Sequence, residues 1–315
     1  MSVVIVTGAS GFLGRHVVER LAARGHEVHA FGRDVVPFDR ARVRGHRVDL
    51  LDPAATGAAV DAVRAEGLIH LAWETAHGDY WSSPSNLDWT AASLRLVRDF
   101  RDRGGRRAVL AGSSAEYDWS AASPLEEERS PIRPIGLYGR CKNALREVLD
   151  AWAPIAGMSW AWGRIFNIYG SFEKPERLVP RVIRALEEGR TLPFDDGGLV
   201  RDFLRVEDAA DAFAALYESE AQAAVNIASG EAVSVREVVE TIAAALPYAG
   251  RIEFGALQRP SDAQPRVVAS VRRLREEVGW SPRRTLREGL RETCDWWRAR
   301  SKAGEPTLAG RSGPE

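Results

Sequence analysis

The stretch VVIVTGASGFLGR, residues 3–15, decides the fold. It opens with an uninterrupted run of β-branched residues, which is typical of a strand covered on both faces. Three glycines then follow in the spacing G-x-x-G-x-x-G and lead into a helical pattern. Glycines at such a turn let a pyrophosphate group approach backbone N–H groups at the positive end of a helix. The stretch therefore predicts a dinucleotide-binding turn, with contacts from Gly8, Ser10, Gly11, Phe12, Leu13 and Gly14.

The same alternation of short apolar runs and helical patterns continues to about residue 165. Apolar runs without polar alternation indicate strands of a parallel sheet whose two faces are covered by helices. We therefore predict an α/β fold, namely a Rossmann-type doubly wound parallel sheet with a smaller C-terminal α/β substrate domain. The predicted strands are EVHAFGR (27–33), GLIHLAW (67–73) and RRAVLAGSS (106–114), and the predicted helices include HVVERLAARG (16–25) and VEDAADAFAALYES (206–219).

Two domains are expected along the chain. Residues 1–170 form the NAD(P)-binding Rossmann domain, and residues 203–228 return to it. Residues 171–202 and 229–300 form the domain that binds the substrate. The last 15 residues, 301–315, are polar and rich in Gly and Pro, so we expect a disordered tail.

The composition limits the classes of partner that we expect for the protein. The chain of 315 residues has a net charge of -1, which gives no reason to expect nucleic acid or an anionic membrane as a partner. Its two cysteines, Cys141 and Cys294, lie far apart without metal-ligand spacing, so neither a metal site nor a disulfide framework is indicated. The chain begins directly with the first strand and has no apolar run of membrane-spanning length, so we expect a cytoplasmic protein.

The choice of dinucleotide depends on the end of the second strand. An acidic side chain there usually binds the adenosine ribose, whereas an arginine accommodates a 2'-phosphate. The sequence has both Arg33 and Asp34, and Arg33 comes first, so we favour NADP and keep NAD as possible. Asp49, after the third strand, is placed to accept the adenine amino group or to cap a helix.

The catalytic residues are indicated by a lysine. Only Lys142, Lys174 and Lys302 are lysines among the 43 basic residues, and Lys142 lies four residues after Tyr138 on a predicted helix. A nearby ammonium group favours phenolate and makes a tyrosine a better acid or base near neutral pH. Ser113 or Ser114, at the end of a predicted strand, is placed to hold the substrate oxygen. Such a trio fits hydride transfer at a carbonyl or alcohol carbon.

These stretches resemble the extended short-chain dehydrogenases/reductases, specifically their nucleotide-sugar epimerase, dehydratase and ketoreductase group. The resemblance runs from residue 3 to about 297, in the family's order. It implies NAD(P), a nucleotide diphosphate sugar as substrate, and a homodimer. The matching stretches are TGASGFLG, VDLLD, IHLAW, GSSAEY, YGRCK, RIFNIYG, VRDFLRVEDAADAF, NIASGE and EEVGWSPRRTLREGL.

The resemblance also implies roles for single residues. It places the catalytic tyrosine and lysine at Tyr138 and Lys142, and it selects Ser113 because the family's Ser or Thr lies four residues before a second tyrosine. Further cofactor contacts are expected from Leu50, Leu71, Ala72 and Trp73. Tyr138 and Lys142 are also expected to contact the cofactor, with the lysine bound to the nicotinamide ribose. The resemblance implies substrate contacts from Trp73, Ser114, Asn167 and the arginines Arg201 and Arg259, whose planar guanidinium groups suit a diphosphate.

Three departures from the family pattern affect the function. Family dehydratases carry an acid–base carboxylate at the position of Ala115, whereas this chain has Glu116 one residue later, so dehydration is disfavoured. Asp118 stands where the family commonly has glycine, so the local loop is expected to differ. Large side chains replace the small residues after HLA; they either line a deoxysugar pocket or pack in the core, and they are Trp73, Trp81 and Trp89, with His77 nearby.

We therefore predict an NADPH-dependent ketoreductase that acts on a nucleotide-linked 4-keto-6-deoxy sugar, with Tyr138 as the general acid. The alternative is an NAD-dependent nucleotide-sugar 4-epimerase, which oxidises and reduces the same carbon and keeps its cofactor. A member without turnover is disfavoured by the complete trio. The sequence leaves the sugar, the nucleotide base and the stereochemistry of the product open.

Overall fold

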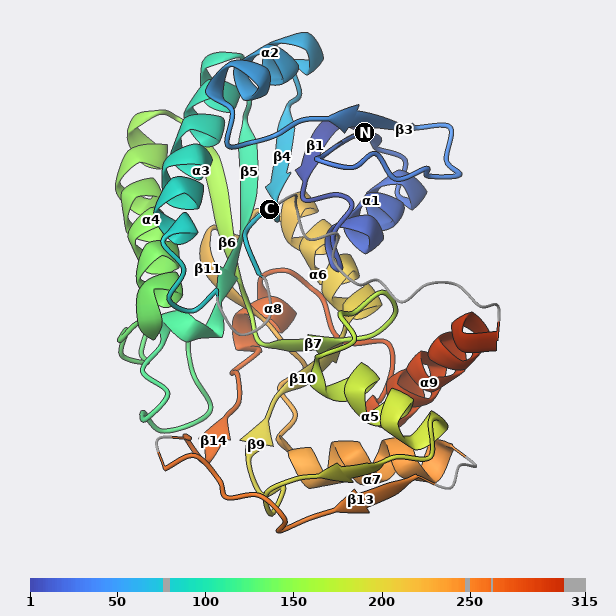
Figure 1. Cartoon of the computed structure of the whole chain (residues 1–315). Coiled ribbons are helices and arrows are strands. Elements are labelled where there is room, and N and C mark those ends of the chain that lie inside the picture. Colours follow the sequence, from blue (N-terminus) through green and yellow to red (C-terminus); the bar gives the residue numbers. More distant parts are fainter. Residues whose placement is uncertain (76–79, 247–249, 262, 303–315) are drawn as a thin grey trace.

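The protein is built around one large parallel sheet. The computed structural model describes residues 1–75, 80–246, 250–261 and 263–302. The strand order of the sheet is β11-β6-β5-β4-β1-β2-β3, and all neighbouring strands are parallel (Figure 1). This order confirms the predicted Rossmann-type doubly wound sheet. The strands are β1 (Val3–Thr7), β2 (Glu27–Gly32), β3 (Val43–Arg47), β4 (Gly67–His70), β5 (Arg107–Ser113), β6 (Ser159–Ile165) and β11 (Ala223–Ile227).

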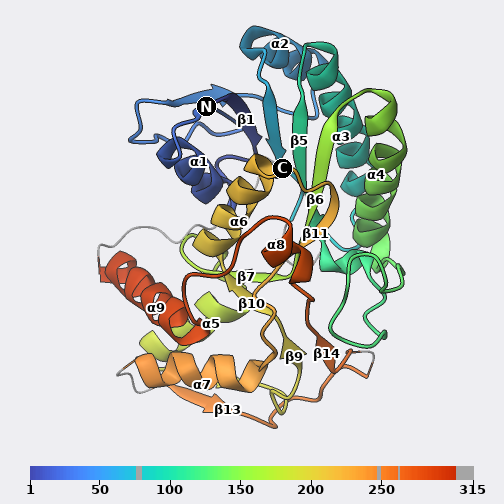
Figure 2. The ribbon, with the colours of Figure 1, turned by 180° about the vertical axis from the view of Figure 1, so that it is seen from behind.

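Helices cover both faces of this sheet, as Figures 1 and 2 show from opposite sides. One face carries α2, α3 and α4, and the other carries α1 and α6. Each helix buries one stripe of apolar side chains; α3, for example, buries Trp89, Leu96 and Phe100. The helices are α1 (Gly14–Ala23), α2 (Pro53–Val63), α3 (Ser85–Asp102), α4 (Gly136–Ile155) and α6 (Val206–Glu218).

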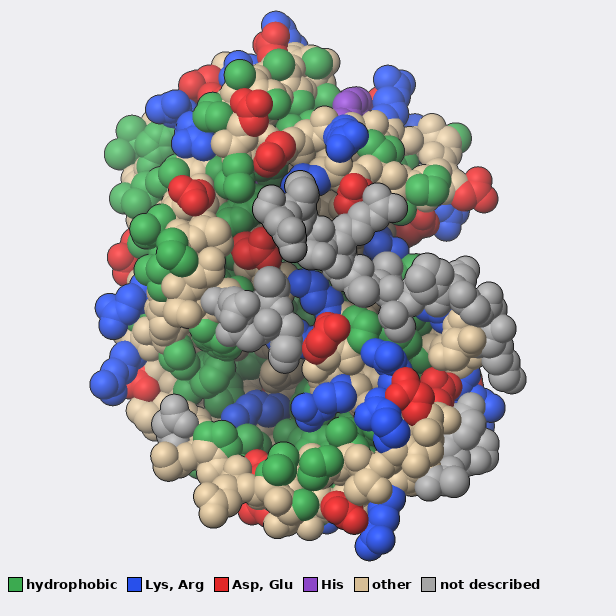
Figure 3. Space-filling view, viewed as in Figure 1, with side chains coloured by type: hydrophobic (Ala, Val, Ile, Leu, Met, Phe, Trp, Pro, Cys, Tyr) green, Lys and Arg blue, Asp and Glu red, His purple; other side chains and the backbone are tan. Residues whose placement is uncertain are grey.

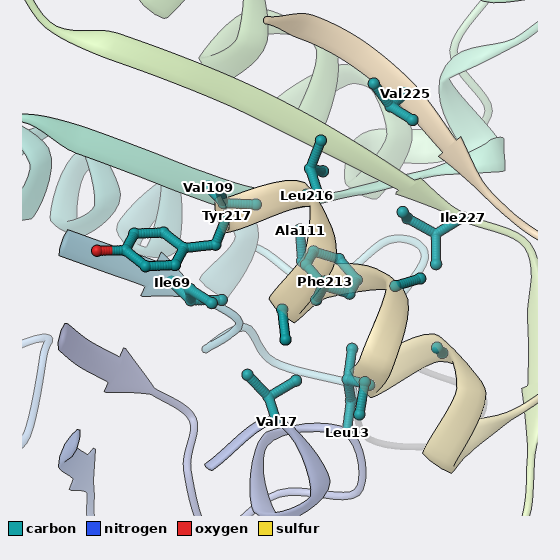
Figure 4. Close-up of a cluster of buried hydrophobic side chains, with 14 of the residues drawn as sticks. Leu13, Val17, Ile69, Val109, Ala111, Phe213, Leu216, Tyr217, Val225 and Ile227 are labelled. Atoms are coloured by element: carbon teal, nitrogen blue, oxygen red, sulfur yellow. The ribbon is translucent and has the colours of Figure 1, made fainter. Parts of the chain in front are cut away.

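The core between the sheet and α6 is closely packed because of small residues. Ala209, Ala210 and Ala212 are fully buried and let α6 lie close to its neighbours. The ring of Phe213 occupies the space above Gly163 of β6, where a Cβ atom would come within 2.7 Å of it. Figure 4 shows this ring among side chains from α1, the sheet and α6. The late segment α6–β11 thus completes the layer begun by the first half of the chain.

A smaller set of elements lies at the carboxyl ends of the strands. Helices α5, α7 and α9 pack together beside small sheets of two or three short strands, around a core that includes Val182, Val238 and Trp297. β10 pairs with β7 here rather than with the large sheet. The elements are β7 (Asn167–Tyr169), α5 (Leu178–Glu187), β8 (Thr191–Pro193), β9 (Val200–Arg201), β10 (Phe203–Arg205), β12 (Val233–Ser234), α7 (Val235–Ala245), β13 (Arg251–Glu253), β14 (Arg266–Val267) and α9 (Leu286–Lys302). Helix α8 (Arg272–Glu276) instead packs against β11 of the large sheet.

Helix α9 extends to Lys302. Residues 301 and 302, which we assigned to a disordered tail, are therefore helical, because they continue the pattern of α9. The rest of that predicted tail, 303–315, lies outside the described residues.

Candidate active site

The turn after β1 has the shape that a pyrophosphate group requires. Gly8 has a φ of 66°, in the left-handed region that favours glycine, and its carbonyl accepts a hydrogen bond of 2.9 Å from the Gly11 N–H. A Cβ atom on Gly14 would lie 2.0 Å from that carbonyl oxygen, so no side chain fits there. The turn therefore remains narrow, and the start of α1 is open to an anion, which fits the pyrophosphate of a dinucleotide.

A buried hydrogen-bond chain fixes the next strand end. The Thr7 hydroxyl accepts hydrogen bonds from the N–H groups of Leu71 and Ala72, at 3.2 and 3.3 Å, and its own proton then points to His70 Nδ1 at 2.7 Å. Burial lowers the pKa of His70 to about 3, so the ring is neutral and Nε2 donates to Ser93 Oγ at 2.8 Å. The sequence analysis missed this network, although IHLAW contains its histidine.

The predicted adenosine contacts lie at an exposed edge. Arg33 and Asp34 follow β2 directly, and within the described part of the chain neither side chain has a hydrogen bond or ion pair. Asp49 is not the helix cap that we considered, because the N-cap of α2 is Asp52. The carboxylate of Asp49 accepts a hydrogen bond from the Leu51 N–H at 3.0 Å and is exposed, whereas the neighbouring Leu50 is buried.

The predicted catalytic trio lies at the carboxyl end of β5. Tyr138 and Lys142 are four residues apart on α4, and both are buried. Lys142 Nζ donates to the carbonyl oxygen of Ala111 on β5 at 2.9 Å, and Ser113, the last residue of β5, is close enough to the Tyr138 phenol to affect its pKa. Ser114 begins the following 3₁₀ turn, η1 (Ser114–Glu116), and its carbonyl accepts a hydrogen bond from Trp119.

The protonation of the trio is set mainly by burial. Burial raises the pKa of the Tyr138 phenol, while Ser113 and the positive charge of Arg177 act in the opposite direction. In the chain alone, the lowering that we expected at Tyr138 is thus outweighed by desolvation. Burial also lowers the pKa of Lys142 to about 7, although the charge of Glu116 raises it. Arg177 was not predicted from the sequence.

Glu116 does not face the substrate side. Its carboxylate is fully buried and accepts hydrogen bonds of 2.8 Å from the Ser113 N–H, from Trp162 Nε1 and from Arg164 Nε. The ion pair with Arg164 is also fully buried, with exposed fractions of 0% and 2%. These donors hold the Glu116 carboxylate in the interior beneath Ser113. This position does not support an acid–base role for Glu116.

Aromatic side chains surround Tyr138. The rings of Tyr80, Trp81 and Trp73 meet its ring nearly edge to face, with centroids 5.0, 5.7 and 6.4 Å away. Trp119, which the sequence analysis did not select, packs against Trp81 at 6.2 Å. Trp73 and Trp81 thus lie beside the tyrosine.

Trp89, by contrast, belongs to the core between α3 and the sheet. His77 lies outside the described residues.

The predicted diphosphate residues lie on the smaller set of elements. The pKa of Arg201 is lowered mainly by burial and, to a smaller extent, by the positive charge of Arg259. The two arginines are therefore close to each other. Arg259 forms an ion pair with Asp196. Asn167 is exposed on β7, and its amide donates to the Asp202 carbonyl at 3.1 Å. On the face seen in Figure 3, Lys and Arg side chains gather across the middle of the molecule.

A pocket of about 560 Å³ opens beside Arg201. It lies between the loop after η1, the start of α4 and the segment before β14. Two further arginines, Arg133 and Arg140, line it, and sequence reasoning missed both because they lie in a loop and on the far side of α4 from Tyr138. The lining residues are Asp118, Trp119, Ser120, Arg133, Pro134, Ile135, Arg140, Arg201, Ala263 and Gln264.

Residues 4–228 match the sequence pattern of the NAD dependent epimerase/dehydratase family. The chain belongs to this family. It is therefore an NAD(P)-dependent enzyme of the group that contains nucleotide-sugar epimerases, dehydratases and reductases. None of the helices within the described residues is long and apolar enough to cross a membrane.

Its relatives include enzymes of several reactions. The chain is 30% identical to the GDP-6-deoxy-D-mannose reductase of Pseudomonas aeruginosa, over 94% of this chain and 97% of that protein. It is 28% identical to the dTDP-6-deoxy-L-talose 4-dehydrogenase (NAD(P)(+)) of Kitasatospora kifunensis, over 95% and 96%. Its structure is similar to that of the Thermus thermophilus UDP-glucose 4-epimerase with NAD, with a TM-score of 0.83 and 27% identity, over 94% and 99% of the two chains.

Proposed function

We propose that the protein is an NADPH-dependent ketoreductase acting on a nucleotide-linked 4-keto-6-deoxy sugar. The observation that carries this proposal is the cluster of Ser113, Tyr138 and Lys142 at the carboxyl end of β5, in which Tyr138 and Lys142 are buried and Ser113 is half-buried. Two relatives named as a 6-deoxy sugar reductase and a 6-deoxy sugar dehydrogenase support the substrate class. The buried, ion-paired Glu116 supports reduction over dehydration.

Each member of the cluster has a distinct task in this proposal. When bound, the nicotinamide cofactor supplies a hydride for the keto carbon. Tyr138 donates its phenolic proton to the oxygen of that carbonyl group, and the Ser113 hydroxyl binds the same oxygen. The ammonium group of Lys142 stabilises the phenolate that remains on Tyr138. Because Tyr138 and Lys142 are buried, these charges interact in a medium of low dielectric constant.

The cofactor and the substrate are assigned to separate groups of residues. The turn at Gly8, Ser10, Gly11, Phe12, Leu13 and Gly14 would hold the pyrophosphate, with Leu50, Leu71, Ala72 and Trp73 lining the rest of the cofactor site. Arg33 would bind the 2'-phosphate of NADPH, and Asp49 the adenine. Arg201, Arg259 and Asn167 would bind the diphosphate of the substrate, with Ser114 and Trp73 facing its sugar.

Two further expectations go with this assignment. The substrate domain would comprise residues 171–202 and 229–300. A homodimer is consistent with exposed apolar side chains on the paired helices α3 and α4, which are Leu87, Val148 and Ile155.

The test is the loss of reduced-cofactor absorbance when the purified protein meets a nucleotide-linked 4-keto-6-deoxyhexose. We expect rapid oxidation of NADPH and little oxidation of NADH. Tyr138→Phe should lower the rate at least about 100-fold, because a positioned general acid contributes about that much or more. The same variant should bind the dinucleotide as tightly as the wild type, and near-normal turnover would overturn the mechanism.

The second candidate is an NAD-dependent nucleotide-sugar 4-epimerase. Asp34, exposed beside Arg33, favours it as a ribose ligand, and so does the similarity to an epimerase that binds NAD. An epimerase returns the hydride to the same carbon and does not need to release its cofactor. Protein purified with bound NAD that oxidises neither NADPH nor NADH would therefore favour this candidate.

A further inference from the structure

The ammonium group of Lys142 lies on the face of an indole ring. Its Nζ atom is 3.7 Å from the centroid of the Trp73 ring, and the lysine is 4% exposed. The same atom donates to the Ala111 carbonyl at 2.9 Å. A cation over the face of tryptophan is attracted by the electron density of the ring, and more strongly when water is excluded.

The Trp73 ring is held in this position. Its Nε1 donates to Asn86 Oδ1 at 2.8 Å, and Asn86 is fully buried. The amide nitrogen of Asn86 donates to the carbonyls of Tyr80 and Ser83, at 2.7 and 2.8 Å, which fixes the orientation of the amide group. Because the ring is tethered, its face remains directed at the lysine instead of rotating to pack elsewhere.

Few other groups near Lys142 can stabilise a positive charge. Burial lowers the pKa of Lys142 to about 7, and Glu116, which is already paired with Arg164, is the one anion among the described residues that raises it. The nearby His70 is neutral, and Tyr138 is protonated at neutral pH. Without a further favourable contact, a large share of Lys142 would be uncharged at neutral pH.

We propose that Trp73 is a positioning residue whose indole face keeps Lys142 in place beside Tyr138 as a cation. This inference rests on the proposed function, in which Lys142 stabilises the phenolate. It also gives a reason for a large side chain at a position where small residues are expected.

The low lysine content makes a direct test possible. With only three lysines in the chain, protein labelled with ¹³C at lysine Cε gives three side-chain NMR signals. Lys142→Arg identifies the signal of Lys142, and its chemical shift is followed from pH 5 to pH 10. We expect Trp73→Leu to lower the titration midpoint of Lys142 by about one pH unit. Trp73→Phe should lower it less, because it keeps an aromatic face.

Trp89→Phe is the matched control. Trp89 lies 6.4 Å from Trp73, is buried in the core and does not contact Lys142, so its variant should leave the midpoint unchanged. If Trp73→Leu does not fold, Trp73→Met fills the space without a ring. An unchanged midpoint in the folded Leu or Met variant would overturn the proposal.

Turnover separates this inference from the proposed function. In Trp73→Leu, more of Lys142 should be uncharged at pH 8 than at pH 6. The rate of NADPH-dependent reduction by this variant should therefore fall further below the wild-type rate at pH 8 than at pH 6. If the protein is not a ketoreductase, no form oxidises NADPH, yet the midpoint still shifts. If Trp73 only packs, the wild type oxidises NADPH and the midpoint stays where it is.

Discussion

Two glutamates are buried near the active site, and they are held in opposite ways. Glu116, beneath β5, accepts three hydrogen bonds of 2.8 Å and pairs with Arg164. Glu173, in the segment after β7, accepts one hydrogen bond of 3.3 Å from the Gly170 N–H and forms no ion pair with the described part of the chain. Burial raises the pKa of Glu173 to about 8.

The difference shows that surroundings, and not burial alone, decide the charge of a carboxyl group. Glu116 is stabilised as an anion by its donors and its cation, whereas Glu173 keeps its proton at neutral pH because too few groups compensate for lost hydration. The floor of the site under Ser113 is therefore fixed by charge. The segment from Gly170 to Arg177, whose Arg177 guanidinium lies over the ring of Tyr80, instead carries a buried and protonated carboxyl group.

The largest effect is expected where the paired glutamate is broken. Glu116→Ala leaves Arg164 charged in the interior without its carboxylate partner, and such a loss costs about 3–5 kcal/mol of unfolding free energy. Urea unfolding of the variant and the wild type at pH 7 measures this cost.

The control replaces both partners. In Glu116→Leu combined with Arg164→Met, no unpaired charge remains, so the part of the lost stability that is due to the charge should return, while the Ser113 N–H and Trp162 Nε1 stay without an acceptor. A Glu116→Ala protein within about 1 kcal/mol of the wild type would show that this pair does not fix the floor of the site.

A smaller and pH-dependent effect is expected at the unpaired glutamate. The folded-state pKa of Glu173, about 8, lies above the value of about 4.3 for an unfolded chain, so the folded protein holds a proton that the unfolded chain has lost between these pH values. Its contribution to stability is therefore present below pH 4 and is lost as the pH rises to 8, by up to about 1.4 kcal/mol per pH unit. Glu173→Gln, which stays neutral, should remove this loss.

Unfolding midpoints from pH 5 to pH 8 test this prediction. Glu176→Gln is the matched control, because Glu176 is an exposed carboxyl group in the same segment. If the wild type and Glu173→Gln lose stability in parallel over this range, Glu173 is already ionised in the folded protein, and the contrast with Glu116 fails.

The same contrast explains what could be predicted from the sequence. The parallel sheet and the glycine turn follow from local patterns, which are continuous apolar runs and glycine spacing, and the structure confirms this fold class. The pair Tyr138 and Lys142 follows from helical periodicity, although the catalytic roles stay predictions.

The state of the two glutamates could not be predicted in the same way. Glu116 follows two serines and precedes a tyrosine, so its local sequence is that of a catalytic loop, and only the partner Arg164, 48 residues later, shows that it points inward. Glu173 lies in the polar stretch FEKPER, which resembles an exposed turn. Contacts between residues far apart in the sequence decide the state of both glutamates, and the edge-to-face contact of Trp119 with Trp81 is likewise formed between distant residues.

The smallest effect is expected at Arg177, whose charge acts both on Tyr138 in the active site and on the buried Glu173. The charge of Arg177 lowers the pKa of both Tyr138 and Glu173, and in each case it is the weakest of the named influences. Arg177→Met should therefore raise the pH at which Glu173 loses its proton by a fraction of a unit. It should leave the unfolding free energy at pH 5 nearly unchanged, because Glu173 is protonated there with or without the arginine. Repeating the pH series on Arg177→Met measures the shift, and Arg181→Met, one helical turn further along α5, is the matched control. A shift as large in the control would mean that the net charge of α5 acts on Glu173. A shift confined to Arg177→Met would assign the effect on Glu173 to this one side chain.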